Sequence, residues 1–195
     1  MRRLVLTARV GLGLAAVGAL AGCHHVTKTP AEAYQRFSAA VSARDGAALF
    51  DALDQPTRWA WMTIQKYHRE AYDIVLSNYP EGPERERESH RFQGGATATS
   101  ARELFRAEVA PGLLPMLAPL VVADAKIEEP TADGHAAAVL ASGARVPFSL
   151  GTDGGWGFSG LAKDAQDLNT RAFHDLEVVR SSAADYERAA TRSAK

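Results

Sequence analysis

Three glycine-containing turns in the second half of the chain constrain its fold more than any other feature. Asp133-Gly134, Ser142-Gly143 and Asp153-Gly154-Gly155 follow one another at short, regular intervals. Glycine supplies the positive φ angle that the tightest hairpin turns require. Between the turns, apolar residues alternate with small or polar ones, which is typical of strands with one face on a core. The pattern predicts a four-stranded antiparallel meander, with strands in 120–129, 135–141, 144–150 and 156–161.

The segments on either side of this sheet have the period of helices. Thr29-Pro30-Ala31-Glu32 is a helix start, because threonine can cap the helix, proline fits its first turn and glutamate can complete a capping box. We expect helices over 29–45, 47–53, 57–79 (capped by Thr57), 100–109 (ended by Pro111-Gly112) and 162–192, with an irregular stretch over 79–99.

These elements predict an α+β fold. N-terminal helices pack on the four-stranded meander within a domain over 29–161, and a long C-terminal helical extension occupies 162–195. The apolar positions of this extension recur at steps of three and four residues. We interpret the part around Leu176–Ala190 as a docking surface for a second copy or another protein; the alternative is a solvated tail.

The N-terminus has the layout of an exported leader. Arg2 and Arg3 make it positive, and 10–21 is apolar or glycine throughout. That length is typical of a signal peptide and too short for a stable helix across a bilayer. Leu20-Ala21-Gly22-Cys23 ends the run and holds the only cysteine of the chain.

Leu20-Ala21-Gly22-Cys23 resembles the lipobox of bacterial lipoproteins at every position. The resemblance implies a signal peptide over 1–22, cleavage between Gly22 and Cys23, acylation of Cys23 and a lipidated tether over 23–28. Two other interpretations are an ordinary signal peptide followed by a chance cysteine, and a weak N-terminal transmembrane helix.

Acylation would make the lipid bilayer the partner of Cys23. Two or three acyl chains anchor a protein stably, at about 0.8 kcal/mol per buried CH₂. His24 stands where, in enteric lipoproteins, an aspartate favours retention in the inner membrane. The resemblance therefore implies the outer membrane, with the domain facing the periplasm.

The charge and cysteine content exclude several functions. The chain has 22 basic and 23 acidic residues, and the leader carries three of the arginines, so 19 basic residues remain against 23 acidic ones. A nucleic-acid-binding protein needs a basic face, so we expect no nucleic-acid partner. With Cys23 acylated, no thiol remains for a disulfide, a nucleophile or a metal site. Since His24-His25 alone is a poor metal site, we expect no metal and no cofactor.

The aromatic side chains of the 57–79 helix are the main candidates for a site. Trp61 and His68 fall on its apolar face, and Tyr72 lies beside that face. The simpler interpretation is that these side chains pack in a core. The alternative is that Trp61, His68 and Tyr72 line a pocket, with His68 as its titratable group.

A second resemblance covers about 29–161. Three segments carry it: Thr29-Pro30-Ala31-Glu32-Ala33-Tyr34, then Ala43-Arg44-Asp45-Gly46-Ala47-Ala48-Leu49, and the late Gly154-Gly155-Trp156-Gly157-Phe158. They resemble the NTF2-like superfamily, which implies a cone of helices against a curved antiparallel sheet, with a cavity at its mouth. The long 57–79 helix and the C-terminal helix depart from that pattern.

Two functions are compatible with these features. The first is a membrane-anchored lipoprotein that is no enzyme and that binds a ligand or takes part in envelope assembly, since no catalytic, metal or phosphate-binding motif is present. The alternative, implied by the NTF2-like resemblance, is an enzyme in which His68 or Asp124 acts as the general base in an apolar cavity.

Overall fold

A computed structural model describes residues 26–193 of the chain. Its helical segments are α1 (Pro30–Ser42), α2 (Gly46–Ala52), α3 (Gln55–Asn78), α4 (Pro83–Thr97), α5 (Ala101–Leu104), the π-helical turn η1 (Phe105–Val109), α6 (Ala110–Leu117), the 3-10 turn η2 (Ala118–Leu120) and α7 (Ala162–Ser193). Its strands are β1 (Lys126–Ile127), β2 (His135–Val139), β3 (Arg145–Leu150) and β4 (Trp156–Phe158).

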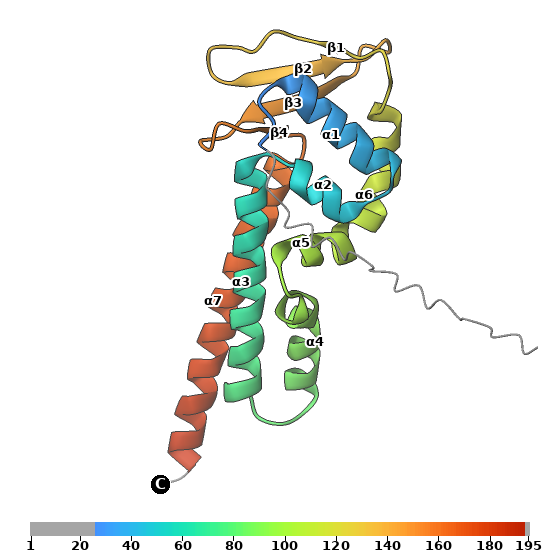
Figure 1. Ribbon diagram of the computed structural model, residues 1–195. Coiled ribbons are helices and arrows are strands. Elements are labelled where there is room, and N and C mark those ends of the chain that lie inside the picture. Colours follow the sequence, from blue (N-terminus) through green and yellow to red (C-terminus); the bar gives the residue numbers. More distant parts are fainter. Residues whose placement is uncertain (1–25, 194–195) are drawn as a thin grey trace, which may run out of the picture.

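These elements form a head and a stalk (Figure 1). The head contains the sheet with α1, α2, α5 and α6, and α1 packs on the sheet. The stalk contains α3, α4 and α7, which run away from the head with α3 in contact with both of the others. The α+β fold class predicted from the sequence, with its long C-terminal helix, is confirmed.

The sheet is the predicted antiparallel meander, in the order β1-β2-β3-β4. Gly134, Gly143 and Gly154 have φ angles of 74°, 82° and 77°, the left-handed conformation that favours glycine. The strands are shorter than predicted. Most of the predicted first strand, 120–129, is taken up by the end of η2 and a turn, which leaves only Lys126–Ile127 in β1.

Side chains cap the starts of α1 and α3. The predicted cap of α1 is confirmed, since Thr29 accepts a hydrogen bond from the Glu32 N–H. The prediction that Thr57 caps the third helix is wrong, because α3 begins earlier and Asp54 is its cap. Aspartate is a better cap than threonine, and the proline after it fits the first turn of α3.

The stretch over 79–99, predicted to be irregular, is helical over most of its length. Pro83 begins α4, and Glu84 and Glu86 lie in its first turn, where negative charge favours a helix. Phe92 is fully buried in the stalk. Burial of this ring outweighs the low helix propensity of Gly94-Gly95.

The helix that begins after Ser100 does not end at Pro111-Gly112 as predicted. Helical turns continue from α5 through η1 into α6. In η1 the Ala110 N–H donates to the Phe105 carbonyl, one residue farther back than in an α-helix. Pro111 then stands in the first turn of α6, where its missing N–H costs little.

Two apolar clusters hold the molecule together, one in each part. In the head, the ring of Phe37 on α1 lies 4.5 Å from Phe158 and 6.4 Å from Phe148, centroid to centroid. In the stalk, the buried side chains include Phe92 of α4 and Leu176 of α7. The long α3 contributes to both clusters and thereby joins head to stalk.

Candidate functional site

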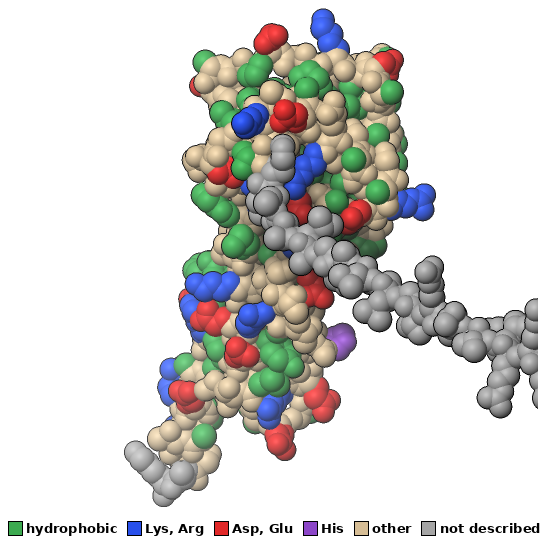
Figure 2. All heavy atoms as spheres, in the orientation of Figure 1, with side chains coloured by type: hydrophobic (Ala, Val, Ile, Leu, Met, Phe, Trp, Pro, Cys, Tyr) green, Lys and Arg blue, Asp and Glu red, His purple; other side chains and the backbone are tan. Residues whose placement is uncertain are grey.

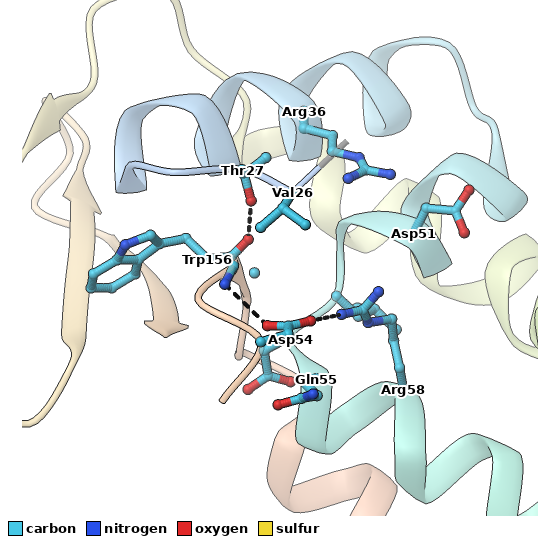
Figure 3. Close-up of a pocket in the computed structure, with 12 residues that line it drawn as sticks. Val26, Thr27, Arg36, Asp51, Asp54, Gln55, Arg58 and Trp156 are labelled. Atoms are coloured by element: carbon cyan, nitrogen blue, oxygen red, sulfur yellow. Dashed lines mark hydrogen bonds and ion pairs between the residues drawn. The ribbon is translucent and has the colours of Figure 1, made fainter. Parts of the chain in front are cut away.

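A polar pocket lies where the head, the stalk and the N-terminal segment meet (Figure 3). Its walls include Arg36 of α1, Asp51 of α2, Arg58 of α3 and Trp156 of β4. The cavity volume is about 30 Å³. That is room for about one or two water molecules and for no organic ligand.

The N-terminal segment enters this pocket through Thr27 and is bonded there to β4. The Trp156 N–H donates to the Thr27 carbonyl at 2.9 Å, and the Thr27 hydroxyl donates to the Trp156 carbonyl. Thr27 is buried although it lies close to the start of the described chain. The N-terminal segment is therefore fixed at the junction of head and stalk.

Asp54 is the buried carboxylate of the pocket, with only 3% of its surface exposed. One oxygen, Oδ1, accepts the Thr57 N–H at 3.1 Å, and Oδ2 accepts the Ser149 hydroxyl at 2.7 Å. Its own N–H donates to the Phe158 carbonyl at 3.0 Å. Asp54 thus connects the first turn of α3 to β3 and β4, and both of its oxygens are occupied.

The close approach of β4 to this carboxylate depends on a glycine. A Cβ at Gly157 would lie 2.5 Å from the Asp54 backbone. No real Cβ approaches backbone atoms so closely, so a side chain at this position would push β4 away from α3.

The turn between β3 and β4 is held to α3 by side chains on both sides. Arg58 Nη2 lies 3.4 Å from Asp153 Oδ2, and Asp153 Oδ1 accepts the Gly155 N–H at 3.0 Å. Gln55 Oε1 accepts the N–H and the hydroxyl of Thr152 at 2.8 and 2.7 Å. Together with Asp54, these bonds make the pocket a joint between head and stalk.

The third carboxylate of the pocket is also paired. Asp51 receives two hydrogen bonds from Arg102 Nε, at 3.1 Å and 3.0 Å, and lies 2.9 Å from its Nη2. The bond to Asp51 raises the pKa of Arg102 above its ordinary value. All three carboxylates of the pocket are therefore paired, and none of them is free to act as a general base.

The three residues predicted to line a pocket lie along α3 in different surroundings. Trp61 is buried in the head cluster, edge-on to Phe105 at 5.4 Å between ring centroids. His68 lies farther along α3 against Phe92 of α4, at 5.8 Å. Tyr72 is partly buried at the edge of the stalk cluster. Each of these side chains packs against a different neighbour.

His68 is held in an apolar setting. Burial lowers its pKa below the ordinary value, Arg91 lowers it further, and Asp175 opposes the change. A Cβ at Gly95 would lie 2.5 Å from the His68 Cβ, so α4 leaves no free space over the imidazole. His68 is thus half-buried and packed against α4, and this burial holds its pKa below the ordinary value.

Two other predicted sites lie in different surroundings. Asp124, the second suggested base, is exposed in the turn before β1. On α7, Leu176, Val179 and Ala183 are buried in the stalk cluster, so this apolar face of the suggested docking helix is covered within the chain. The outward side of α7 stays exposed.

The residues of the joint were missed at the sequence level, and the predicted lipid site cannot be placed. Asp153 was interpreted only as part of a turn, and Asp54 was not recognised as a cap, although the spacing of Asp54 to Thr57 is that of a helix cap. Cys23, the Gly22 cleavage position and His24-His25 lie outside the described residues.

Compared with protein-family models, with curated proteins and with solved structures, the chain gives no match. The lipobox and NTF2-like resemblances thus stay predictions from the residues quoted above. Within residues 26–193, no helix is long and apolar enough to cross a membrane. The same part of the chain holds no group of three or more His, Cys, Asp or Glu side chains arranged to bind a metal ion.

Proposed function

We propose that this chain is a bacterial lipoprotein of the cell envelope, acylated at Cys23 and acting as a non-enzymatic binding or assembly module. The observation that carries the proposal is Leu20-Ala21-Gly22-Cys23, which directly follows the apolar run of the leader and contains the only cysteine. By the same resemblance, with His24 after the cysteine, the protein is placed at the outer membrane, facing the periplasm.

The position of the tether supports this proposal. Four positions separate Cys23 from Thr27, which is hydrogen-bonded to β4. A tether this short, joined to a fixed point, holds a folded body next to the membrane. Such an arrangement suits a protein that works at the bilayer surface.

The state of the titratable groups favours binding or assembly over catalysis. His68 is packed against Phe92 and Gly95, and the carboxylates of the joint are paired. A general base needs open access to a substrate proton as well as a suitable pKa. His68, packed against α4, lacks that access, and Asp124 lies exposed in the turn before β1.

We further propose that the outward side of α7 around Leu176–Ala190 contacts a protein partner or a second copy. Val178 is 48% exposed there, on the side that α3 leaves uncovered. Removing 182–195 is expected to leave the fold intact and weaken association. The truncation also removes Tyr186, whose ring lies 4.9 Å from Tyr79, so Tyr186→Ala in the full chain is the control for lost packing. An unchanged oligomeric state and pull-down profile would count against this surface.

Cell fractionation tests the anchor. The test variant carries Cys23→Ser and, in place of 1–22, a leader that ordinary signal peptidase removes. We expect the wild type to need detergent for extraction and to co-sediment with outer membranes, and the variant to be released with the periplasmic contents. Release of the wild type without detergent, or membrane retention of the variant, would contradict the proposal.

A further inference from the structure

An exposed apolar patch surrounds the point where the tether joins the body. Val26, Trp59 and Met62 are 41%, 55% and 56% exposed. All three line one groove of about 310 Å³ at the top of α3, which we call the junction patch. Figure 2 shows hydrophobic side chains grouped along one edge of the narrowing between head and stalk.

Val26, Trp59 and Met62 belong to neither of the two apolar clusters. Trp59 and Met62 are three residues apart on α3, so they lie on the same side of the helix, whereas Ala60 and Trp61 turn into the head cluster. A large aromatic and a methionine left half exposed, side by side, mark a contact surface more often than an accident of packing.

The length of the tether decides what lies against this patch. Three residue steps separate Cys23 from Val26. At about 3.3–3.6 Å per residue, the chain can span at most about 11 Å between them. The headgroup region of a bilayer is about 5–8 Å deep on each side. If Cys23 carries lipid, Val26 and its groove therefore lie at the headgroup layer.

The chemistry of the patch suits that layer. Tryptophan concentrates at membrane interfaces, because its ring is apolar while its N–H remains hydrogen-bonded. The charged neighbour Arg58 is paired with Asp153 at the rim of the groove, which keeps the patch close to neutral. Lys66, exposed one turn beyond Met62, can bury its methylene stem and reach lipid phosphates.

We propose that the junction patch of Val26, Trp59 and Met62 inserts into the headgroup layer of the bilayer and orients the body beside its acylated cysteine. This inference rests on the proposed lipidation of Cys23. The lipid chains hold the protein at the membrane, and the patch determines which face of it the membrane covers.

Site-specific fluorescence tests the insertion. Met62→Cys and, as the matched control, Met116→Cys on α6 each replace an exposed methionine, since Met116 is 74% exposed and lies outside the patch. Each variant, purified from membranes, is checked for acylated Cys23 by mass, labelled with an environment-sensitive dye and placed in phosphatidylethanolamine–phosphatidylglycerol vesicles. Nitroxide-labelled lipids and aqueous iodide are the two quenchers.

We expect the label at position 62 to shift to the blue, to lose emission to nitroxide lipids and to be protected from iodide, whereas the label at position 116 is quenched by iodide alone. Equal lipid quenching at both positions in acylated protein would overturn the insertion and leave the lipoprotein proposal standing. Protection of position 62 from iodide without lipid quenching would show that a second copy covers the patch. This result would also overturn the insertion. Absence of acyl mass would refute the lipoprotein proposal instead.

Discussion

The replacement Asp54→Ala tests the bonds by which this side chain connects the first turn of α3 to the sheet. It removes the cap of α3, which costs about 1 kcal/mol, within a range of about 0.5–2. It also leaves the buried Ser149 hydroxyl without its acceptor, which costs about 1–3 kcal/mol. We therefore expect the free energy of unfolding to fall by about 2–4 kcal/mol, and Tm by about 5–15 °C for a chain of this size.

The assay is urea unfolding of the purified protein in a mild nonionic detergent, monitored by far-UV circular dichroism. Asp54→Asn is the control, because an asparagine oxygen still caps the helix. The free energy of unfolding should therefore fall clearly less in this variant than in Asp54→Ala. Ser149→Ala completes a double-mutant cycle with Asp54→Ala. A loss below about 1 kcal/mol for Asp54→Ala, or strictly additive losses in the cycle, would refute the role of this bond as a joint.

Three further predictions concern Gly157 beside the joint and two side chains of the stalk, Phe92 and His68. Gly157→Ala should destabilise the fold by about 1–3 kcal/mol in urea unfolding, because its Cβ would meet the Asp54 backbone; full stability would contradict the close approach. Phe92→Ala should cost about 3–5 kcal/mol and speed amide hydrogen exchange in α4, and unchanged exchange there would speak against anchoring by this ring. Because the folded pKa of His68 is lowered, unfolded chains bind its proton first, so stability should fall as pH drops below about 6.5. His68→Gln should flatten that pH dependence, and an unchanged slope in this variant would refute the assignment.

The sheet was predictable because its signals are local. Glycines in the turns at Gly134, Gly143 and Gly154 specify hairpins whatever the rest of the chain does, and they have the expected positive φ angles. The long C-terminal helix was predictable for a related reason, since its apolar period repeats over many turns.

α4 was missed because its stability comes from other elements. Its two adjacent glycines weaken the helical signal of its sequence, and the burial of Phe92 against α3 and α7 adds the stability that the sequence alone does not show. In the same way, Asp54 and Ser149 are 95 positions apart, so nothing in the sequence indicated that the two side chains would meet.

The junction patch shows where sequence reasoning about α3 stopped. Trp59 lies on the predicted 57–79 helix, but helical periodicity does not show that its side chain stays exposed beside the N-terminal segment, which is bonded through Thr27 to Trp156. Conversely, Trp61 and His68 were suggested as pocket residues because helical periodicity cannot distinguish a filled core from a cavity.

The intact mass of the protein extracted from membranes tests the central claim most directly, with the wild type compared to Cys23→Ser in the natural leader. The account predicts that the wild type begins at Cys23 and carries the added mass of two or three acyl chains. It also predicts that the variant carries none and retains the leader. A wild-type protein that keeps residues 1–22, or that begins elsewhere without lipid, would contradict the account and remove the basis for the bilayer contact of the junction patch.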